Sequence, residues 1–163
     1  MDNSDVKILL VDDNDVTREV LRVILRSEHY SVVGEATDGG AALEMALKLF
    51  PDIIMLDLVM PKISGMEILP KLREMLPNAK ILVVTANKDH DMVSEVVKAG
   101  IHGYILKPFN AQRIIDTVAA AHNLDAYTNL LKRDGTLVLL RSVNAGASLS
   151  TVTGGLSTAS TSG

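Results

Sequence analysis

The sequence predicts an α/β fold: a doubly wound parallel sheet built from five βα units and followed by a C-terminal extension. Short, continuously apolar runs recur along the first three quarters of the chain, and stretches with helical spacing of apolar residues separate them. Unbroken apolar runs suit strands that are buried on both faces, as in parallel sheets. Their alternation with helices favours a sheet covered by helices on both sides.

The first two βα units are expected within residues 7–49. The first apolar run covers residues 7–11, and the helix after it carries apolar residues on one face and arginines on another. These two faces consist of Val16, Val20, Ile24 and Leu25, and of Arg18, Arg22 and Arg26. The second run covers residues 32–36, and Asp38 is the expected N-cap of a helix over residues 42–49.

The other three units follow the same pattern. Their apolar runs are residues 53–56, 81–84 and 103–106. The third helix is expected to start near Ser64, and Pro70 within it requires a kink or an early position in the helix. Gly100 is expected to end the fourth helix, and Asn110 to cap the fifth. Apolar residues at helical spacing mark these helices: Met66, Leu69, Leu72 and Leu76; Met92, Val93, Val96 and Val97; Ile114, Ile115, Val118 and Ala119.

Composition excludes several classes of protein. The chain has 163 residues, of which 47% are hydrophobic and 22% charged, which is the balance of a globular domain rather than of a disordered chain. The net charge of −4 and the 3% of aromatic residues argue against direct nucleic-acid binding. No apolar run approaches the ~18 residues of a membrane-spanning helix. The acidic start is unlike a secretory signal, and cysteine is absent, so we expect a cytoplasmic protein.

Polar side chains follow four of the five expected strands, at the point where each strand ends. Asp12 and Asp13 follow the first strand, Asp57 the third, Thr85 the fourth and Lys107 the fifth. The carboxyl ends of parallel strands meet at one edge of the sheet, where such folds bind ligands. Three carboxylates, a hydroxyl and an ammonium group are therefore expected to lie close together.

This set of groups suits metal-assisted phosphoryl transfer. Carboxylate oxygens are the protein ligands that Mg²⁺ prefers, and a divalent cation relieves their mutual repulsion. A carboxylate can also attack phosphorus and form an acyl phosphate. A lysine and a metal ion then spread the charge that develops on the phosphoryl oxygens, and a threonine hydroxyl can donate a hydrogen bond to one of them.

Each of these residues also has an ordinary explanation when taken alone. Asp12 and Asp13 can cap a helix, Thr85 can cap one too, and Lys107 can be a surface lysine with a buried stem. Asp57 is harder to explain, because it interrupts an apolar run between two leucines and a buried carboxylate needs a partner or a function. The coincidence of all five at consecutive strand ends carries the functional interpretation.

Four motifs together resemble the receiver domain of two-component response regulators, the CheY-like family. They are residues 8–14 (Ile-Leu-Leu-Val-Asp-Asp-Asn), 56–61 (Leu-Asp-Leu-Val-Met-Pro) followed by Gly65, 83–86 (Val-Val-Thr-Ala) and 103–109 (Gly-Tyr-Ile-Leu-Lys-Pro-Phe). The resemblance covers about residues 5–123. It implies a flavodoxin-like (βα)5 sheet with strand order 2-1-3-4-5, a receiver domain over residues 1–123 and a C-terminal extension over residues 124–163.

The resemblance also implies a role for each site residue. Asp57 is the implied phosphoacceptor. Lys107 binds the phosphoryl group, Thr85 follows that group, and Tyr104 changes rotamer as the switch. Read without the family, Tyr104 is a half-buried aromatic with its hydroxyl in water. The implied Mg²⁺ ligands are Asp12, Asp13, Asp57 and the main-chain carbonyl of Val59. The peptide bond between Lys107 and Pro108 is expected to be cis, as is common in the family.

The implied function is a signalling switch rather than an enzyme. A histidine kinase or phosphotransfer protein donates the phosphoryl group, and a downstream protein reads the surface of the fourth helix, fifth strand and fifth helix. Family members tune dephosphorylation through the positions occupied here by Val59 and Asn87. Because Val59 cannot hydrogen-bond an attacking water, we expect a long-lived phosphoryl group.

Three other functions are considered for this chain, of which the first two are disfavoured and the third stays open. A Mg²⁺-dependent phosphatase of the haloacid-dehalogenase type also uses an aspartyl nucleophile, but it resembles this chain poorly because Val59 stands where it needs a second Asp. A dinucleotide-binding domain requires glycines where residues 12–15 are acidic. A DNA-binding regulator cut short, or a homodimer formed through the tail, remains open.

The tail differs in composition from the rest of the chain. No charged residue follows Arg141, and residues 145–163 are Ser, Thr, Gly or Ala with three exceptions. Residues 124–133 are compatible with a short helix, and residues 136–140 and 148–153 with two strands of a hairpin. A flexible Ser/Thr/Gly tail from Ala145 onward is an equal alternative. The four histidines, His29, His90, His102 and His122, are scattered and are expected at the surface or in loops.

Overall fold

A parallel sheet of five strands alternates with five helices. The computed structural model of the chain describes residues 2–122, 138–140 and 149–151. The elements are β1 (Lys7–Val11), α1 (Asp15–Ser27), β2 (Ser31–Ala36), α2 (Gly39–Leu49), β3 (Ile53–Leu56), α3 (Gly65–Met75), β4 (Lys80–Thr85), α4 (His90–Ala99), β5 (Gly103–Leu106), α5 (Ala111–His122), β6 (Val138–Leu140) and β7 (Leu149–Thr151). The parallel strands lie in the order β2-β1-β3-β4-β5. This order and the five βα units confirm the predicted fold.

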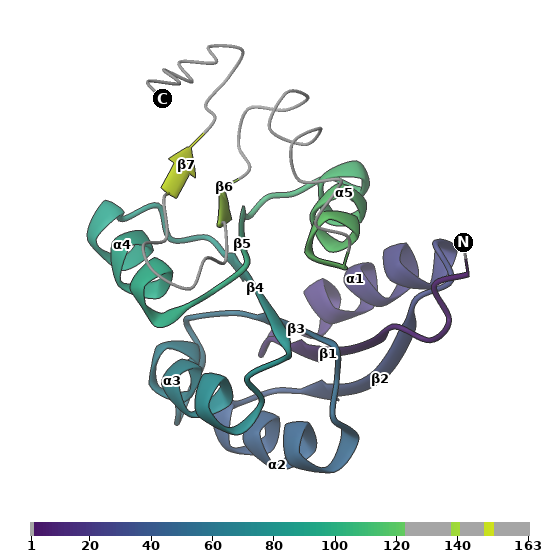
Figure 1. Cartoon of the computed structure of the whole chain (residues 1–163), viewed down its shortest axis with the longest axis horizontal. Helices are drawn as coiled ribbons and strands as arrows, with labels where there is room; N and C mark the ends of the chain where they lie inside the picture. Colours follow the sequence, from purple (N-terminus) through teal and green to yellow (C-terminus); the bar gives the residue numbers. More distant parts are fainter. Residues whose placement is uncertain (1, 123–137, 141–148, 152–163) are drawn as a thin grey trace.

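The sheet separates two hydrophobic cores, one on each face. Helices α1 and α5 cover one face, and α2, α3 and α4 cover the other (Figure 1). Successive residues of each strand point to opposite faces. In β1, for example, Leu9 packs toward α2 and α3, whereas Ile8 and Leu10 pack toward α1 and α5. Burial of alternate residues in both cores explains why the strands read as unbroken apolar runs.

Side-chain caps define where the helices begin, as the sequence predicts. The carboxylate of Asp38 accepts a hydrogen bond from the Ala41 N–H at the start of α2. Asn110 accepts one from the Arg113 N–H at the start of α5. Ser64 and Glu67 form a reciprocal capping box at α3. At the other end of a helix, Gly100 ends α4 with a φ of 94°, a conformation that glycine adopts at little cost.

The buried face of α1 differs from the apolar face that the sequence indicates. Leu21 and Leu25 are the buried residues of this helix. Val16 and Val20 are exposed instead, Val16 by 71%. Leu25 of the expected face is buried and Ile24 packs against the same core, so the buried face of α1 is rotated toward Leu21 and away from the two valines.

Helix α3 starts close beneath the end of β3. A β-carbon on Gly65 would lie 2.1 Å from the main-chain oxygen of Asp57, far inside van der Waals contact. Only glycine therefore allows α3 to begin against the turn that follows Asp57. Pro70 lies inside α3, which continues past it to Met75.

His102 lies in the loop before β5, as expected, but it is buried rather than at the surface. Its side chain is only 9% exposed, and its Nδ1 accepts a hydrogen bond from the Ile81 N–H at 3.1 Å. Its own N–H donates to the Ile81 carbonyl at 2.7 Å. His102 thus extends the pairing of β4 and β5 by one residue. The other three histidines are exposed.

Two further strands extend the sheet beyond β5. Strand β6 pairs antiparallel with β5, with Tyr104 opposite Val138, and β7 pairs antiparallel with β6. Both strands fall within the two segments for which the sequence indicates strand character. The short helix expected over residues 124–133 lies outside the described residues.

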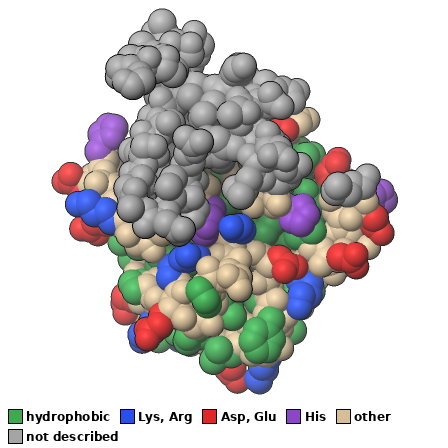
Figure 2. Space-filling model, in the orientation of Figure 1, with side chains coloured by type: hydrophobic (Ala, Val, Ile, Leu, Met, Phe, Trp, Pro, Cys, Tyr) green, Lys and Arg blue, Asp and Glu red, His purple; other side chains and the backbone are tan. Residues whose placement is uncertain are grey.

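The surface of the described residues is mixed in character. Acidic, basic and apolar side chains are interspersed over the described part of the face in Figure 2. Among the described residues, no helix combines the length and apolarity that crossing a membrane requires.

Candidate functional site

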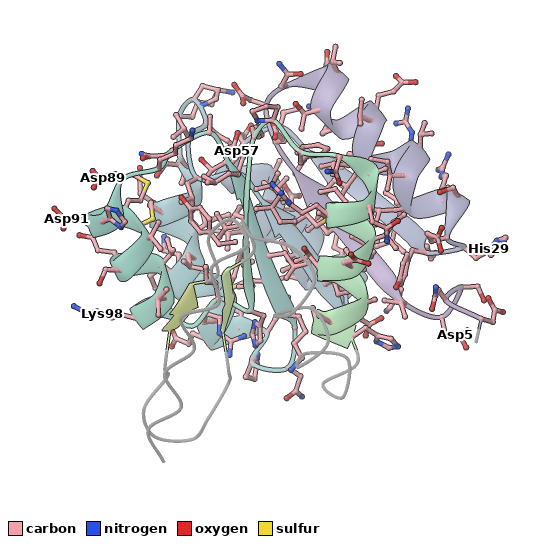
Figure 3. All side chains as sticks on the ribbon, turned by 90° about the horizontal axis from the view of Figure 1, so that it is seen from above. Asp5, His29, Asp57, Asp89, Asp91 and Lys98 are labelled. Carbon is pink, nitrogen blue, oxygen red and sulfur yellow. The ribbon has the colours of Figure 1, made fainter. Side chains whose placement is uncertain are left out.

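The carboxyl ends of β1 and β3 place three acidic side chains together. Val11 and Leu56 are neighbours in the parallel register, so the residues that follow them leave the sheet side by side. The Asp57 N–H continues the ladder by donating to the Val11 carbonyl at 2.9 Å. Figure 3 shows Asp57 at this edge of the sheet, between the two helical layers.

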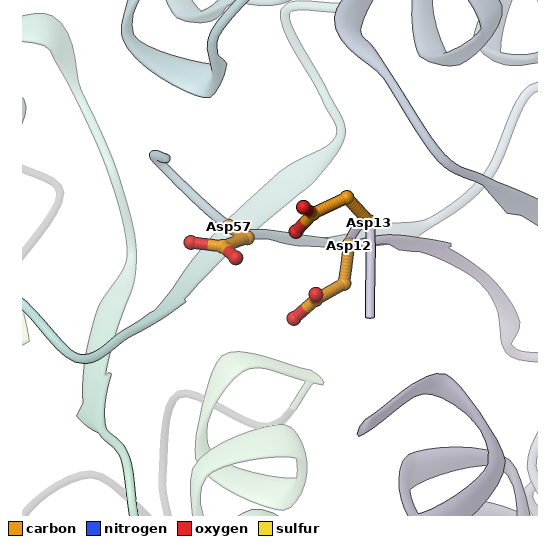
Figure 4. A group of neighbouring side chains, drawn as sticks. All are labelled: Asp12, Asp13 and Asp57. Carbon is orange, nitrogen blue, oxygen red and sulfur yellow. The ribbon is translucent and has the colours of Figure 1, made fainter. Parts of the chain in front are cut away.

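Asp12, Asp13 and Asp57 form a compact acidic cluster. One carboxylate oxygen from each residue lies within 4.8 Å of those from the other two. Asp12 and Asp57 are buried, with exposures of 2% and 6%, and Asp13 is exposed. Their side chains converge on the same small region (Figure 4). Three hard oxygen donors, one of them open to solvent, match the few protein ligands that Mg²⁺ takes while it keeps several waters.

Lys107 joins this cluster from the end of β5. Its Nζ donates to Asp12 Oδ2 at 2.7 Å and to Asp57 Oδ2 at 3.2 Å. Burial disfavours the ammonium charge, but the hydrogen bond to Asp12 and the charges of Asp57 and Asp12 outweigh it, so the pKa of Lys107 is raised. The Lys107–Pro108 peptide bond is cis, as expected. Lys107 therefore stays charged beside both carboxylates.

The carboxyl group of Asp57 is held in an environment that resists its ionisation. Burial raises its pKa, and the charge of Asp12 adds to this effect. The Val59 N–H, which donates to Asp57 Oδ1 at 3.1 Å, and the nearby Lys107 act in the opposite direction. The balance stays on the raised side, and a divalent cation bound beside Asp57 would favour its ionised form.

Thr85 and Tyr104 meet at Asn87 rather than at Asp57. Thr85 is buried, and its Oγ1 accepts a hydrogen bond from the Asn87 N–H at 3.3 Å. The Tyr104 hydroxyl donates to the Asn87 carbonyl at 2.6 Å. Tyr104 is 2% exposed, and burial, together with the charge of Asp89, raises its pKa to about 12. The alternative interpretation of Tyr104, a half-buried tyrosine with its hydroxyl in water, is therefore wrong.

The sequence analysis did not identify Arg18 as a site residue. One guanidinium nitrogen of Arg18 donates to the main-chain carbonyl of Asp12 at 2.7 Å. A hydrogen bond to a main-chain carbonyl cannot be predicted from residue type or spacing, because every residue has such a carbonyl. The only available signal was an arginine in the first turns of the helix that follows Asp12 and Asp13.

Comparison with known proteins identifies the family. The model of the response regulator receiver domain matches residues 8–119. The chemotaxis protein CheY of Thermotoga maritima is 38% identical over 112 residues, which cover 69% of this chain and 93% of that protein. The chain belongs to the response regulator receiver domain family.

Other relatives agree in fold, and they differ in how much of their length is matched. The CheY chain in the CheX-CheY-BeF3-Mg²⁺ complex from Borrelia burgdorferi has a TM-score of 0.70 and 27% identity, covering 72% of this chain and 89% of that one. The transcriptional regulatory protein YdfI of Bacillus subtilis is 37% identical over 130 residues, which cover 78% of this chain but 61% of YdfI. The match therefore covers only part of YdfI.

As a receiver domain, the chain is a signalling module of two-component systems rather than a conventional enzyme. Receiver domains bind Mg²⁺ at the acidic pocket that Asp12, Asp13 and Asp57 form here. Membership of this family favours a switch over a phosphatase of the haloacid-dehalogenase type, in agreement with the valine at position 59.

Proposed function

We propose that Asp57 accepts a phosphoryl group from the phosphohistidine of a histidine kinase or phosphotransfer protein. The observation that carries this proposal is the position of Asp57, whose buried carboxylate lies between Lys107 and the other two acidic residues. A carboxylate oxygen of Asp57 attacks phosphorus, the bond from phosphorus to the histidine nitrogen breaks, and the imidazole leaves with its electron pair. The product is an acyl phosphate on Asp57.

The surrounding residues lower the cost of this step. Mg²⁺, held by Asp12, Asp13, Asp57 and the main-chain carbonyl of Val59, supplies positive charge beside the phosphoryl oxygens when it is bound. Lys107 already lies within hydrogen-bonding distance of Asp57 and contributes a second positive charge. The Val59 N–H orients the Asp57 carboxylate through the bond to Oδ1. Lys107 and the Val59 N–H already contact the Asp57 carboxylate, so these two groups need little reorganisation when the donor arrives.

The switch acts through Asn87. A phosphoryl group on Asp57 adds negative charge and acceptor oxygens, which attract the Thr85 hydroxyl. Asn87 bonds to both Thr85 and Tyr104 through its main chain, and its side chain accepts the Asp89 N–H at 2.8 Å at the start of α4. A movement of Thr85 is therefore transmitted to Tyr104 and α4, the surface that a downstream protein reads.

Part of the C-terminal extension, strand β6 (Val138–Leu140), lies beside the same surface. Strand β6 pairs with β5 at Tyr104, so it adjoins the residue that reports phosphorylation. In this proposal the extension takes part in partner binding or in a homodimer, and residues 1–123 carry out the phosphoryl chemistry.

Phosphorylation by acetyl phosphate tests the proposal. The full chain, Asp57→Asn and the control Asp5→Asn are incubated with and without Mg²⁺, and the intact mass of each is measured. Asp5 is an exposed carboxylate well away from Asp57 (Figure 3). We expect one Mg²⁺-dependent phosphoryl adduct on the wild type and on Asp5→Asn, and none on Asp57→Asn.

Two results contradict the proposal. An adduct that persists in Asp57→Asn places the acceptor elsewhere, and no adduct on the wild type shows that the switch chemistry is lost. Steady hydrolysis of a phosphomonoester by the wild type would favour the phosphatase instead.

A further inference from the structure

Arg18 connects the acidic cluster to the rest of the domain. It lies in the second turn of α1, and its side chain is 12% exposed. A guanidinium nitrogen donates to the Asp12 main-chain oxygen at 2.7 Å, a distance typical of a strong charge-assisted hydrogen bond. The carbonyl that it contacts belongs to the peptide group joining Asp12 to Asp13.

Two carboxylates hold the Arg18 side chain in this position. Its Nε donates to Glu35 Oε1 of β2 at 3.3 Å, and another of its nitrogens pairs with Asp15. Arg22 binds the other oxygen of Glu35 at 2.6 Å, so Glu35 is itself fixed. The planar guanidinium thus spans β2, α1 and the turn after β1, which a smaller cation cannot do.

Asp12 and Asp13 differ in how their carboxylates are held. Asp12 accepts hydrogen bonds from the Asn14 N–H at 2.9 Å and from Lys107 at 2.7 Å. No hydrogen bond to the Asp13 carboxylate is found among the described residues. The backbone therefore sets the position from which the Asp13 side chain reaches toward the cluster, and the peptide group before Asp13 is the one that Arg18 holds.

We infer that Arg18 is a positioning residue for Mg²⁺: by fixing the peptide group between Asp12 and Asp13, it orients the exposed Asp13 carboxylate toward the metal. This inference rests on the proposed function. Groups that orient metal ligands from outside the coordination sphere typically contribute about 10- to 100-fold to affinity. Since Arg18 acts through the backbone of its target, we expect the lower end of this range, about tenfold.

The charge of Arg18 alone predicts the opposite effect. A cation close to a metal site repels the metal, so removing it would strengthen binding. Arg18 pairs with Asp15 and Glu35, whose negative charges oppose this repulsion. The sign of the change in affinity therefore separates positioning from simple electrostatics.

Calorimetric titration with MgCl₂ tests the inference on the full chain. Arg18→Met removes the contact to the Asp12 carbonyl and keeps much of the apolar stem. Arg22→Met is the matched control, because Arg22 also binds Glu35 from α1 but makes no contact with Asp12. Thermal unfolding verifies that both variants fold. We expect Mg²⁺ binding about tenfold weaker in Arg18→Met and within twofold of wild type in Arg22→Met.

A second measurement distinguishes a positioning role from general damage. The rate of phosphorylation by acetyl phosphate is measured as a function of Mg²⁺ concentration. In Arg18→Met the half-saturating concentration should rise with the dissociation constant, while the rate at saturating Mg²⁺ stays within about threefold of wild type. Arg18→Lys keeps the positive charge but lacks the several N–H donors of the planar guanidinium. Its affinity for Mg²⁺ should therefore fall between those of wild type and Arg18→Met.

The results that overturn the inference are specific. A loss of less than fivefold in Arg18→Met, an equal loss in both methionine variants, or tighter binding in Arg18→Met each excludes it. If the wild type binds no Mg²⁺, the proposed function itself fails, and this outcome is distinct from normal binding in wild type and Arg18→Met alike.

Discussion

At the scale of single residues, His102 shows how a buried titratable group ties stability to pH. Burial, together with the positive charges of Lys80 and Arg73, lowers its pKa to about 4 from the usual 6.5. A protonated imidazole also cannot accept the hydrogen bond that the Ile81 N–H donates to Nδ1. The unfolded chain therefore binds a proton more readily than the folded one, and the folded state loses stability as the pH falls from about 6.5 to 4.

His102→Asn should weaken this dependence on pH. The asparagine oxygen can still accept the Ile81 N–H, but it does not titrate. We expect the wild type to lose about 2 kcal/mol more unfolding free energy than this variant between pH 7 and pH 5. Urea unfolding at the two pH values measures the difference, with the exposed His122→Asn as a control that behaves like wild type. Parallel losses in wild type and His102→Asn would contradict the role of His102.

The side chain of Val59 is expected to prolong the lifetime of a phosphoryl group on Asp57. Its exposed apolar side chain offers no hydrogen bond to a water that attacks phospho-Asp57. Val59→Asn should accelerate dephosphorylation by about fivefold, because one orienting hydrogen bond contributes about 1 kcal/mol. The control Val59→Ala changes size without adding a polar group. The decay of the phosphorylated mass after donor removal measures both, and an unchanged rate in Val59→Asn would refute the argument.

At the scale of elements, the start of α3 is fixed by one glycine. Gly65→Ala places a methyl group 2.1 Å from the Asp57 carbonyl, so the turn behind the acceptor must move. We expect a loss of about 2–3 kcal/mol in unfolding free energy, together with slower phosphorylation. In the control Gly40→Ala, the atom nearest to the added β-carbon is a side-chain oxygen of Asp38 at 3.3 Å. Alanine also has a higher helix propensity than glycine. That control should match or exceed wild-type stability in denaturant unfolding.

The strands were predictable because each is buried on both faces, which makes its sequence apolar without interruption. Caps such as Asp38 and Asn110 were predictable because residue type and local geometry suffice for them. The buried face of α1 was predictable only in part: Ile24 and Leu25 contact the core as expected, but Val16 and Val20 are exposed and Leu21 is buried instead. His102 was missed because its burial arises from strand pairing with Ile81, a contact between residues far apart in sequence.

The acidic cluster was predictable for a topological reason. Parallel strands bring their ends to one edge, so residues 44 and 45 positions apart in the chain can be predicted to be neighbours without any knowledge of distances. The hydrogen bonds of Tyr104 and Arg18 could not be predicted in this way, because their acceptors are main-chain carbonyls, which every residue has.

At the scale of the whole molecule, the two cores that the described residues form lie within the receiver domain. Every buried residue of the two described clusters lies between Val6 and Ala121. A chain that ends at residue 123 should therefore unfold cooperatively, with a melting temperature within about 5 °C of the full chain, and keep its Mg²⁺-dependent phosphorylation. Calorimetry and intact mass measure these properties.

The same pair of chains tests the extension. Light scattering on both, with and without acetyl phosphate, gives their masses in solution. A dimer of the full chain that becomes a monomer on truncation assigns self-association to residues 124–163. A truncated chain that aggregates or melts without cooperativity would show that β5 needs β6 at its edge.

The raised pKa of Asp57 has an evolutionary consequence. At neutral pH, a carboxylate that ionises less readily in the folded chain than in the unfolded one makes the fold less stable than a neutral side chain of similar shape would. Selection for thermal robustness alone would replace this aspartate. If Asp57 is retained for the phosphoryl transfer that we propose, lineages released from that function are expected to lose this residue before they lose the core leucines around it.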